Sequence, residues 1–140
     1  MGVLRSRKWI ALAVLTLSGA VGVGVALATV TSAIIADTGA GPATSVRLRI
    51  DRTQFVPSAD QPTFSSGWHT HPGPVIIQVQ EGYLKITQAT CHPNVIGPGE
   101  TYFETAELPV LATANQAAKW TATLIVPADK PLRTNVVGPC

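Results

Sequence analysis

The chain has 140 residues, which is enough for one ordinary domain and a short additional segment. Its formal net charge of +2 is unevenly placed, because three basic residues precede the first apolar run, whereas the part from Asp37 onward has seven basic and eight acidic residues. Nucleic-acid binding needs basic residues clustered on the folded part of a chain, so this distribution argues against a nucleic-acid partner.

The first element in chain order is an apolar segment. Trp9–Ile35 contains no charged residue and no proline, and basic residues precede it. We expect residues 1–36 to form a hydrophobic helix that acts either as a cleaved signal peptide or as an uncleaved transmembrane anchor. Ala26–Ala28 has the pattern of a cleavage site, whereas the length of the run suits a membrane span. In both cases the basic flank predicts an extracytoplasmic domain, either secreted or attached to the membrane by a single span.

Residues 37–45 are polar and rich in glycine, so we expect a flexible linker before a domain over residues 46–140. This domain shows no helical periodicity. Apolar side chains instead alternate with polar or mixed ones along four runs, which are Val46–Asp51, Val75–Gln80, Tyr83–Thr87 and Lys119–Val126. Such alternation predicts strands with one buried apolar face, and the turn signals between the runs predict an all-β sandwich or barrel.

The sequence contains two cysteines, Cys91 and Cys140, and both lie in the part that we expect outside the cytoplasm. Paired thiols in an oxidising compartment usually form a disulfide, so we predict a bridge between them. It would close a loop of about 50 residues and fasten the last residue of the chain. The alternatives are two free thiols, or a metal site that uses Cys91 together with His92.

The stretch Gly67–Pro74, with the sequence GWHTHPGP, carries the strongest indication of chemistry. Residues two apart on a strand project from the same face, so His69 and His71 can address one metal ion or one ligand. The alternative is a structural role, in which both imidazoles are only hydrogen-bonded. Weaker candidates are His92 as a further imidazole ligand, and Trp68 and Trp120 as aromatic rings that stack on a ligand.

This stretch resembles the first motif of the cupin family, in which a glycine precedes His-x-His and another glycine follows. The residues that match the motif in type and order are Gly67, His69, His71 and Gly82. Gly97–Glu100 resembles the turn that begins the second half of the family's domain. The resemblance covers about residues 64–127 and implies an all-β jelly-roll (cupin) barrel, here preceded by the N-terminal hydrophobic helix.

Two positions depart from the family's pattern. The glutamate ligand of the family corresponds to Val75, and counting back from Asn115 places the second-motif histidine at Leu111. Both replacements are apolar and cannot bind a metal, so only His69 and His71 remain of four familiar ligands. A catalytic mononuclear site usually has three protein ligands. Two imidazoles alone should therefore hold a divalent metal such as Zn, Fe, Mn or Ni weakly, or hold none.

These observations lead to three hypotheses about function. The first, which we favour, is an exported non-catalytic cupin that binds a small molecule or a weakly held divalent metal. The second is a metal-dependent enzyme, an oxygenase or isomerase, which needs a third ligand; Glu104 and Glu107 lie near the second motif, but the sequence does not fix their direction. The third is an envelope interaction module. The resemblance and the exposed strand edges also predict a homodimer.

Overall fold

A computed structural model describes residues 27–88 and 90–140 of the chain. This part contains β-strands and no helix, and none of its elements is therefore a helix that could cross a membrane. The strands in chain order are β1 (Thr29–Asp37), β2 (Val46–Val56), β3 (Phe64–Ser65), β4 (His69–Thr70), β5 (Val75–Glu81), β6 (Leu84–Gln88), β7 (Pro93–Ile96), β8 (Thr101–Glu104), β9 (Val110–Ala114), β10 (Ala118–Pro127) and β11 (Thr134–Asn135).

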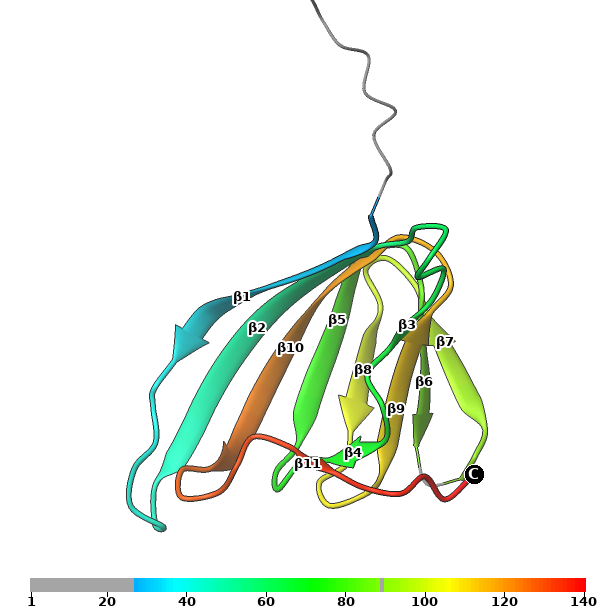
Figure 1. Cartoon of the computed structure of the whole chain (residues 1–140). Coiled ribbons are helices and arrows are strands. Elements are labelled where there is room, and N and C mark those ends of the chain that lie inside the picture. The colour runs from blue at the N-terminus through cyan, green and yellow to red at the C-terminus, as the bar shows by residue number, and fades with distance from the viewer. Residues whose placement is uncertain (1–26, 89) are drawn as a thin grey trace, which may run out of the picture.

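The strands form two antiparallel sheets. The first has the order β1-β2-β10-β5-β8, and the second has the order β11-β4-β9-β6-β7, with β3 paired to β9. Figure 1 shows β1, β2, β10 and β5 along one side of the domain and β9, β6 and β7 on the other. Strands far apart in the sequence are neighbours in both sheets, as in a jelly roll. The predicted all-β jelly-roll barrel is therefore confirmed.

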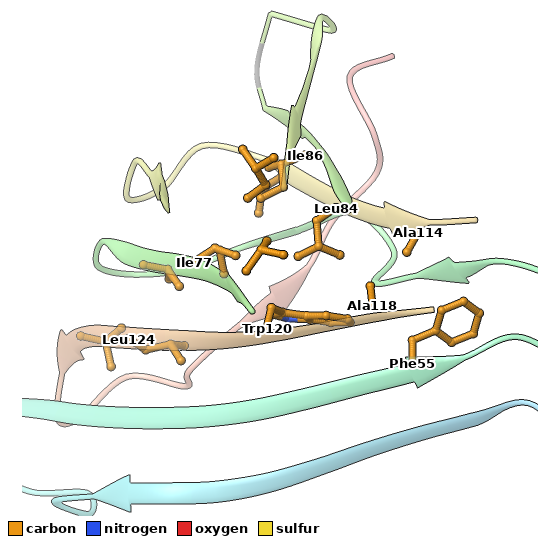
Figure 2. Close-up of a cluster of buried hydrophobic side chains, with 13 residues drawn as sticks. Phe55, Ile77, Leu84, Ile86, Ala114, Ala118, Trp120 and Leu124 are labelled. Atoms are coloured by element: carbon orange, nitrogen blue, oxygen red, sulfur yellow. The ribbon is translucent and has the colours of Figure 1, made fainter. Parts of the chain in front are cut away.

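The core lies between the two sheets. Figure 2 shows Phe55 and Trp120 from the first sheet and Leu84 and Ile86 from the second sheet pointing into the same interior. These strands carry the predicted alternation, and the core consists of apolar residues from their inward faces. Burying each large apolar side chain contributes roughly 1.5–3 kcal/mol, so the core fixes how the sheets face each other.

Strand β1 corrects the prediction for the N-terminal segment. We expected residues 1–36 to form one hydrophobic helix, but Thr29–Asp37 is a strand that pairs with β2 over most of its length. Hydropathy alone does not distinguish a helix from a strand, and this stretch is rich in β-branched residues, which favour strands. The part of the helix prediction that concerns residues 1–26 lies outside the described residues.

The predicted linker over residues 37–45 is also not a free tether. Asp37 ends β1, and the residues after it form the connection to β2. The amide of Gly41 donates to the carbonyl of Ala128 at 3.3 Å, and the amide of Ala128 donates to the carbonyl of Ser45 at 3.0 Å. These backbone bonds attach the connection to the residue that follows β10, whereas the glycine-rich composition led us to expect a flexible linker.

Strand β2 has the predicted alternation, but in its first half the apolar side chains face solvent and the charged side chains face the interior. Val46 is 65 % exposed and Leu48 is 37 % exposed, whereas Arg49 and Asp51 face the interior and line a cavity there. The charged side chains can point inward because they compensate each other, with Arg49 Nε 2.9 Å from a carboxylate oxygen of Asp51. Alternation therefore identified the two faces of this strand without showing which face is buried.

The predicted disulfide joins Cys91 to Cys140, which are 49 residues apart in the sequence. It fastens residues 129–140, which we call the C-terminal strap. Figure 1 shows the strap crossing the end of the barrel at which β4 and β11 lie. Along its course β11 pairs with β4, and the amide of Val136 donates to the carbonyl of Trp68. The strap thus lies directly against the strand that carries His69.

The double variant Cys91→Ser/Cys140→Ser should be markedly less stable than the wild type. A bridge that closes a loop of about 50 residues contributes about 4 kcal/mol, mainly by restricting the unfolded chain. We expect the melting temperature to fall by about 10 °C or more, measured by thermal unfolding. The wild type in excess reductant should show the same decrease, and an unchanged melting temperature in both samples would contradict the predicted role of the bridge.

Candidate functional site

The interior between the sheets contains a cavity of about 480 Å³. This volume is within the range of pockets that hold small molecules. Both histidines of the His-x-His pair line it, together with one glutamate and two arginines. The side chains that form its walls are Val30, Ser32, Arg49, Asp51, Thr53, Phe64, Ser65, Ser66, His69, His71, Val75, Ile77, Glu104, Ala112, Trp120, Ala122, Leu124, Leu132 and Arg133.

The two imidazoles of His69 and His71 face each other inside this cavity. His69 is 6 % exposed and His71 is 9 % exposed. Their Nε2 atoms lie 3.0 Å apart, and the ring planes are nearly perpendicular. The spacing of two residues along the chain therefore places both rings at one point of the interior, which is the geometry that the sequence led us to expect.

The second nitrogen of each ring is held by a backbone carbonyl. His69 Nδ1 lies 2.8 Å from the carbonyl oxygen of Gly67, and His71 Nδ1 lies 2.6 Å from that of Leu132 on the C-terminal strap. A carbonyl oxygen only accepts, so each Nδ1 must carry the proton and donate. Gly67 has a φ of 67°, which favours glycine at the residue whose carbonyl holds His69.

It follows that the two Nε2 atoms present lone pairs to each other. Burial lowers the pKa of His69 to about 4 and also lowers the pKa of His71, so both rings are neutral at neutral pH. A neutral imidazole whose Nδ1 donates can only accept at Nε2. Two acceptors 3.0 Å apart repel each other unless a proton or another cation lies between them.

Glu104 is the third titratable group of the site. It is the cross-strand partner of Val75, on the neighbouring strand β8. Its Oε2 lies 3.6 Å from Nε2 of His71, and no side chain or backbone group in the described part of the chain hydrogen-bonds to this buried oxygen. The structure therefore places a carboxyl group one strand away from the position at which the family resemblance implies a glutamate.

Burial raises the pKa of Glu104 to about 7. A carboxyl group with such a value is partly protonated at neutral pH and can either give or take a proton there. The sequence contained Glu104 but no signal for its direction, since only the register between β5 and β8 brings it opposite Val75.

The two positions at which the sequence departs from the family's pattern have different surroundings. Val75 is buried and lines the cavity, as the alignment of its motif implied. Leu111 does not line the cavity, because Val110 and Ala112 are the residues of β9 that face the interior. Its inward-facing neighbours Val110 and Ala112 are equally unable to bind a metal.

The structure places one of the remaining candidate residues in the cavity wall and the other two outside it. Trp120 lines the cavity and packs against Phe64 with ring centroids 5.1 Å apart. Trp68 does not line it, and its indole instead lies against Gly138 of the strap. His92 is exposed in the turn next to the disulfide, and it is absent from the cavity wall. The suggestion that Trp68 stacks on a ligand in the barrel is therefore wrong, because the strap covers this residue.

Within residues 27–88 and 90–140, no three His, Cys, Asp or Glu side chains form a group that could hold a metal ion as they stand. The arrangement is a close pair of imidazoles with one carboxyl group beside His71. A third ligand would require Glu104 to turn toward both rings. The prediction of a weakly held metal therefore stays a prediction.

The two sheets and the inward-facing histidine pair are the features of a cupin-type jelly roll. No family model matches the sequence, and no curated protein matches it. Among solved structures, a cupin superfamily protein from Desulfitobacterium hafniense has a TM-score of 0.58 at 13% identity, over 70% of this chain and 78% of its own.

Two further similar structures support the same fold. KdgF from Halomonas sp. has a TM-score of 0.54 at 16% identity, over 70% of this chain and 78% of its own. An uncharacterized protein with a double-stranded beta-helix domain from Klebsiella pneumoniae has a TM-score of 0.57 at 10% identity, over 76% of this chain and 79% of its own. The described part of the chain therefore has the cupin fold. A fold of this kind supports many functions, so the function must be argued from the site.

Glu104→Gln should change the pH dependence of stability. The raised pKa of about 7 means that the folded chain holds this proton more tightly than the unfolded chain, whose value is near 4.5. The stability contributed by the protonated carboxyl is complete below about pH 4.5 and is lost as the pH rises through about 7. Glutamine keeps the shape without ionising, so the variant should be more stable than the wild type at pH 8, by on the order of 2–3 kcal/mol.

The measurement is urea unfolding of both proteins at pH 4 and pH 8 in the presence of a chelator. At pH 4 the two stabilities should agree closely. Glu107→Gln, at an exposed position, is the matched control and should not alter the difference between the two pH values. A Glu104→Gln variant that is less stable than the wild type at pH 8 would show that the ionised carboxylate stabilises the fold.

Proposed function

We propose that the protein is an exported, non-catalytic cupin-fold protein that binds a small molecule and a weakly held divalent metal in its barrel. The observation that carries the proposal is the pair of Nε2 atoms 3.0 Å apart, both acceptors, in a cavity of about 480 Å³. Two neutral imidazoles held in this way present two nitrogen lone pairs that can bind a cation. Zn, Fe, Mn and Ni remain the candidate metals, since imidazole nitrogen suits this group.

The donor set fits a metal ion in two respects. Two nitrogen ligands about 2.1 Å from one ion and at right angles to each other lie about 3 Å apart, as the Nε2 atoms do. The buried Oε2 of Glu104 lacks a hydrogen-bond partner among the described residues, and a cation would satisfy it. The carbonyls of Gly67 and Leu132 hold the rings from behind, as outer partners of metal-binding histidines do.

The site should therefore bind Co²⁺, a spectroscopic substitute for Zn²⁺, in a manner that depends on the pair. We expect His71→Ala to remove measurable binding and Glu104→Gln to weaken it by about tenfold, equivalent to about 1.4 kcal/mol. Calorimetric titration with Co²⁺ and the visible absorption of the bound ion provide the measurements. His92→Ala is the matched control, because this exposed imidazole lies outside the cavity.

Binding that survives His71→Ala, or that is lost in His92→Ala, would contradict this assignment of the metal to the barrel. The alternative of an envelope interaction module predicts no specific Co²⁺ binding, while both histidine variants keep the fold. Co²⁺ binding that is lost in His71→Ala but kept in His92→Ala thus separates metal binding from a purely structural role of the histidine pair.

A metal-dependent enzyme is the second candidate function, and one observation favours it. Glu104, with a pKa raised to about 7, adjoins the cavity and could transfer a proton at neutral pH. A bound divalent metal would supply Lewis-acid polarisation of a substrate oxygen. The chain's own residues would hold the substrate against the apolar wall and exchange a proton at Oε2.

We also propose that the N-terminal segment directs export and is removed after Ala28. Ala26–Ala28 has the small-x-small pattern of a cleavage site, and β1 begins at Thr29, the next residue. Cleavage at this point would remove residues 9–28 of the apolar run and keep every residue of β1 that pairs with β2. An uncleaved anchor remains the alternative, with the domain on the same side of the membrane.

The protein recovered from an expressing bacterial cell should accordingly begin at Thr29. Mass spectrometry of the intact protein and N-terminal sequencing measure this directly. Ala28→Leu should prevent processing and leave the chain in the membrane fraction, because signal peptidase requires a small residue at this position. Recovery of a wild-type chain that still contains residues 1–28 would support the anchor instead.

The predicted homodimer stays a prediction.

A further inference from the structure

The cavity contains a second polar element besides the histidine pair, namely Arg133 on the C-terminal strap. Its side chain lines the same cavity as His69 and His71. Arg133 is exposed to solvent. Because its side chain and both imidazoles line one cavity, a single bound molecule can contact all three.

No carboxylate in the described part of the chain pairs with Arg133. Its Nη2 donates to the carbonyl of Ser66 at 3.0 Å and to the side-chain oxygen of Asn135 at 2.8 Å. Both acceptors are neutral, so they orient the guanidinium without neutralising it. A guanidinium has five N–H donors, and the remaining ones are free to bind an anion in the planar geometry that carboxylates match.

The other charges of the cavity do not neutralise Arg133. Arg49 is 2.9 Å from Asp51 and 3.5 Å from Asp37. Asp37 also pairs with Arg47, so these two arginines and two aspartates compensate each other. The Oε2 of Glu104 lies 3.6 Å from Nε2 of His71, and Glu104 forms no salt bridge with Arg133. The guanidinium of Arg133 is therefore left without a compensating charge on the side of the strap.

The rest of the wall is largely apolar. Phe64, Trp120 and Leu124 line the cavity, and Trp120 and Leu124 also belong to the buried core. A small inorganic anion would leave this surface without a partner. A ligand with an anionic head and a hydrocarbon or aromatic body would satisfy the guanidinium and the apolar wall together, which is the usual composition of a small-molecule pocket.

We propose that the cavity binds a small organic carboxylate, whose carboxylate group is bound by Arg133 and whose hydrocarbon body lies against Phe64 and Trp120. The proposal rests on the proposed small-molecule function of the cavity, but it does not require the metal. Arg133 acts here as a specificity-determining residue. The strap presents it at this place because β11 pairs with β4, the strand that carries His69.

The test uses benzoate and butyrate as probes, each with its amide as the neutral, nearly isosteric control. Titrations of the full-length protein at pH 7 are followed by NMR, after treatment with a chelator and again with Co²⁺ present. We expect benzoate to bind at least about tenfold more tightly than benzamide. Arg133→Gln should lower benzoate affinity about 10- to 100-fold, as expected for the loss of charge-assisted hydrogen bonds, and should leave benzamide unaffected.

Arg52→Gln is the matched control, because Arg52 is an exposed arginine on the opposite face of β2 from the cavity residues Asp51 and Thr53. It removes the same charge from the protein and should retain benzoate affinity within about twofold. Inorganic phosphate is the second control. Phosphate that binds as tightly as benzoate would overturn the assignment of an organic carboxylate, since the apolar wall would then contribute nothing.

Equal affinity for benzoate and benzamide, or unchanged benzoate binding in Arg133→Gln, would overturn the inference. So would the absence of binding by both carboxylates. None of these results affects Co²⁺ binding, which tests the metal site separately. Conversely, Arg133-dependent binding of benzoate by the chelator-treated protein would support the inference even if Co²⁺ does not bind.

Discussion

The site depends on one constraint, which is that both Nδ1 atoms of the histidine pair donate to backbone carbonyls. This fixes the tautomer of each ring and directs two lone pairs at a single point of a largely apolar interior. One carbonyl belongs to the same short segment as the histidines, and the other belongs to Leu132 near the end of the chain. The geometry of the pair is therefore a property of the folded barrel and its strap together, and neither the His-x-His spacing nor the strand alone would produce it.

The local features of the fold could be predicted from the sequence because they depend on side-chain alternation. The runs that became β5, β6 and β10 were recognisable, and their apolar residues form the core. The pairing of Cys91 with Cys140 also followed from the number of cysteines. Strand β1 could not be predicted in this way, because an apolar β-branched run after a hydrophobic segment looks like the continuation of that segment. The orientation of β2 could not be predicted either. Arg49 faces inward because carboxylates from two strands compensate its charge.

The residues of the candidate site also differ in whether the sequence could predict them. His69 and His71 are close in sequence, so their spacing alone indicated that both rings could address one point, although their orientation also depends on the strap. Glu104 reaches the site through the register between β5 and β8. Arg133 reaches it on the C-terminal strap, together with Leu132, from a part of the sequence far from the histidines. Such long-range placements are decided by tertiary packing, so a single sequence contains no signal for them. The apparent loss of the family's carboxylate at Val75 accordingly looks different in the structure, where a carboxyl group occupies the adjacent strand.

The disulfide has a consequence for the time at which the strap is covalently fastened. The strap brings both the carbonyl that orients His71 and the guanidinium of Arg133, and the bond between Cys91 and Cys140 fastens its far end covalently. Thiols stay reduced in the bacterial cytoplasm and become oxidised outside it. On the export route proposed above, the strap would gain its covalent attachment only after the chain has left the cytoplasm.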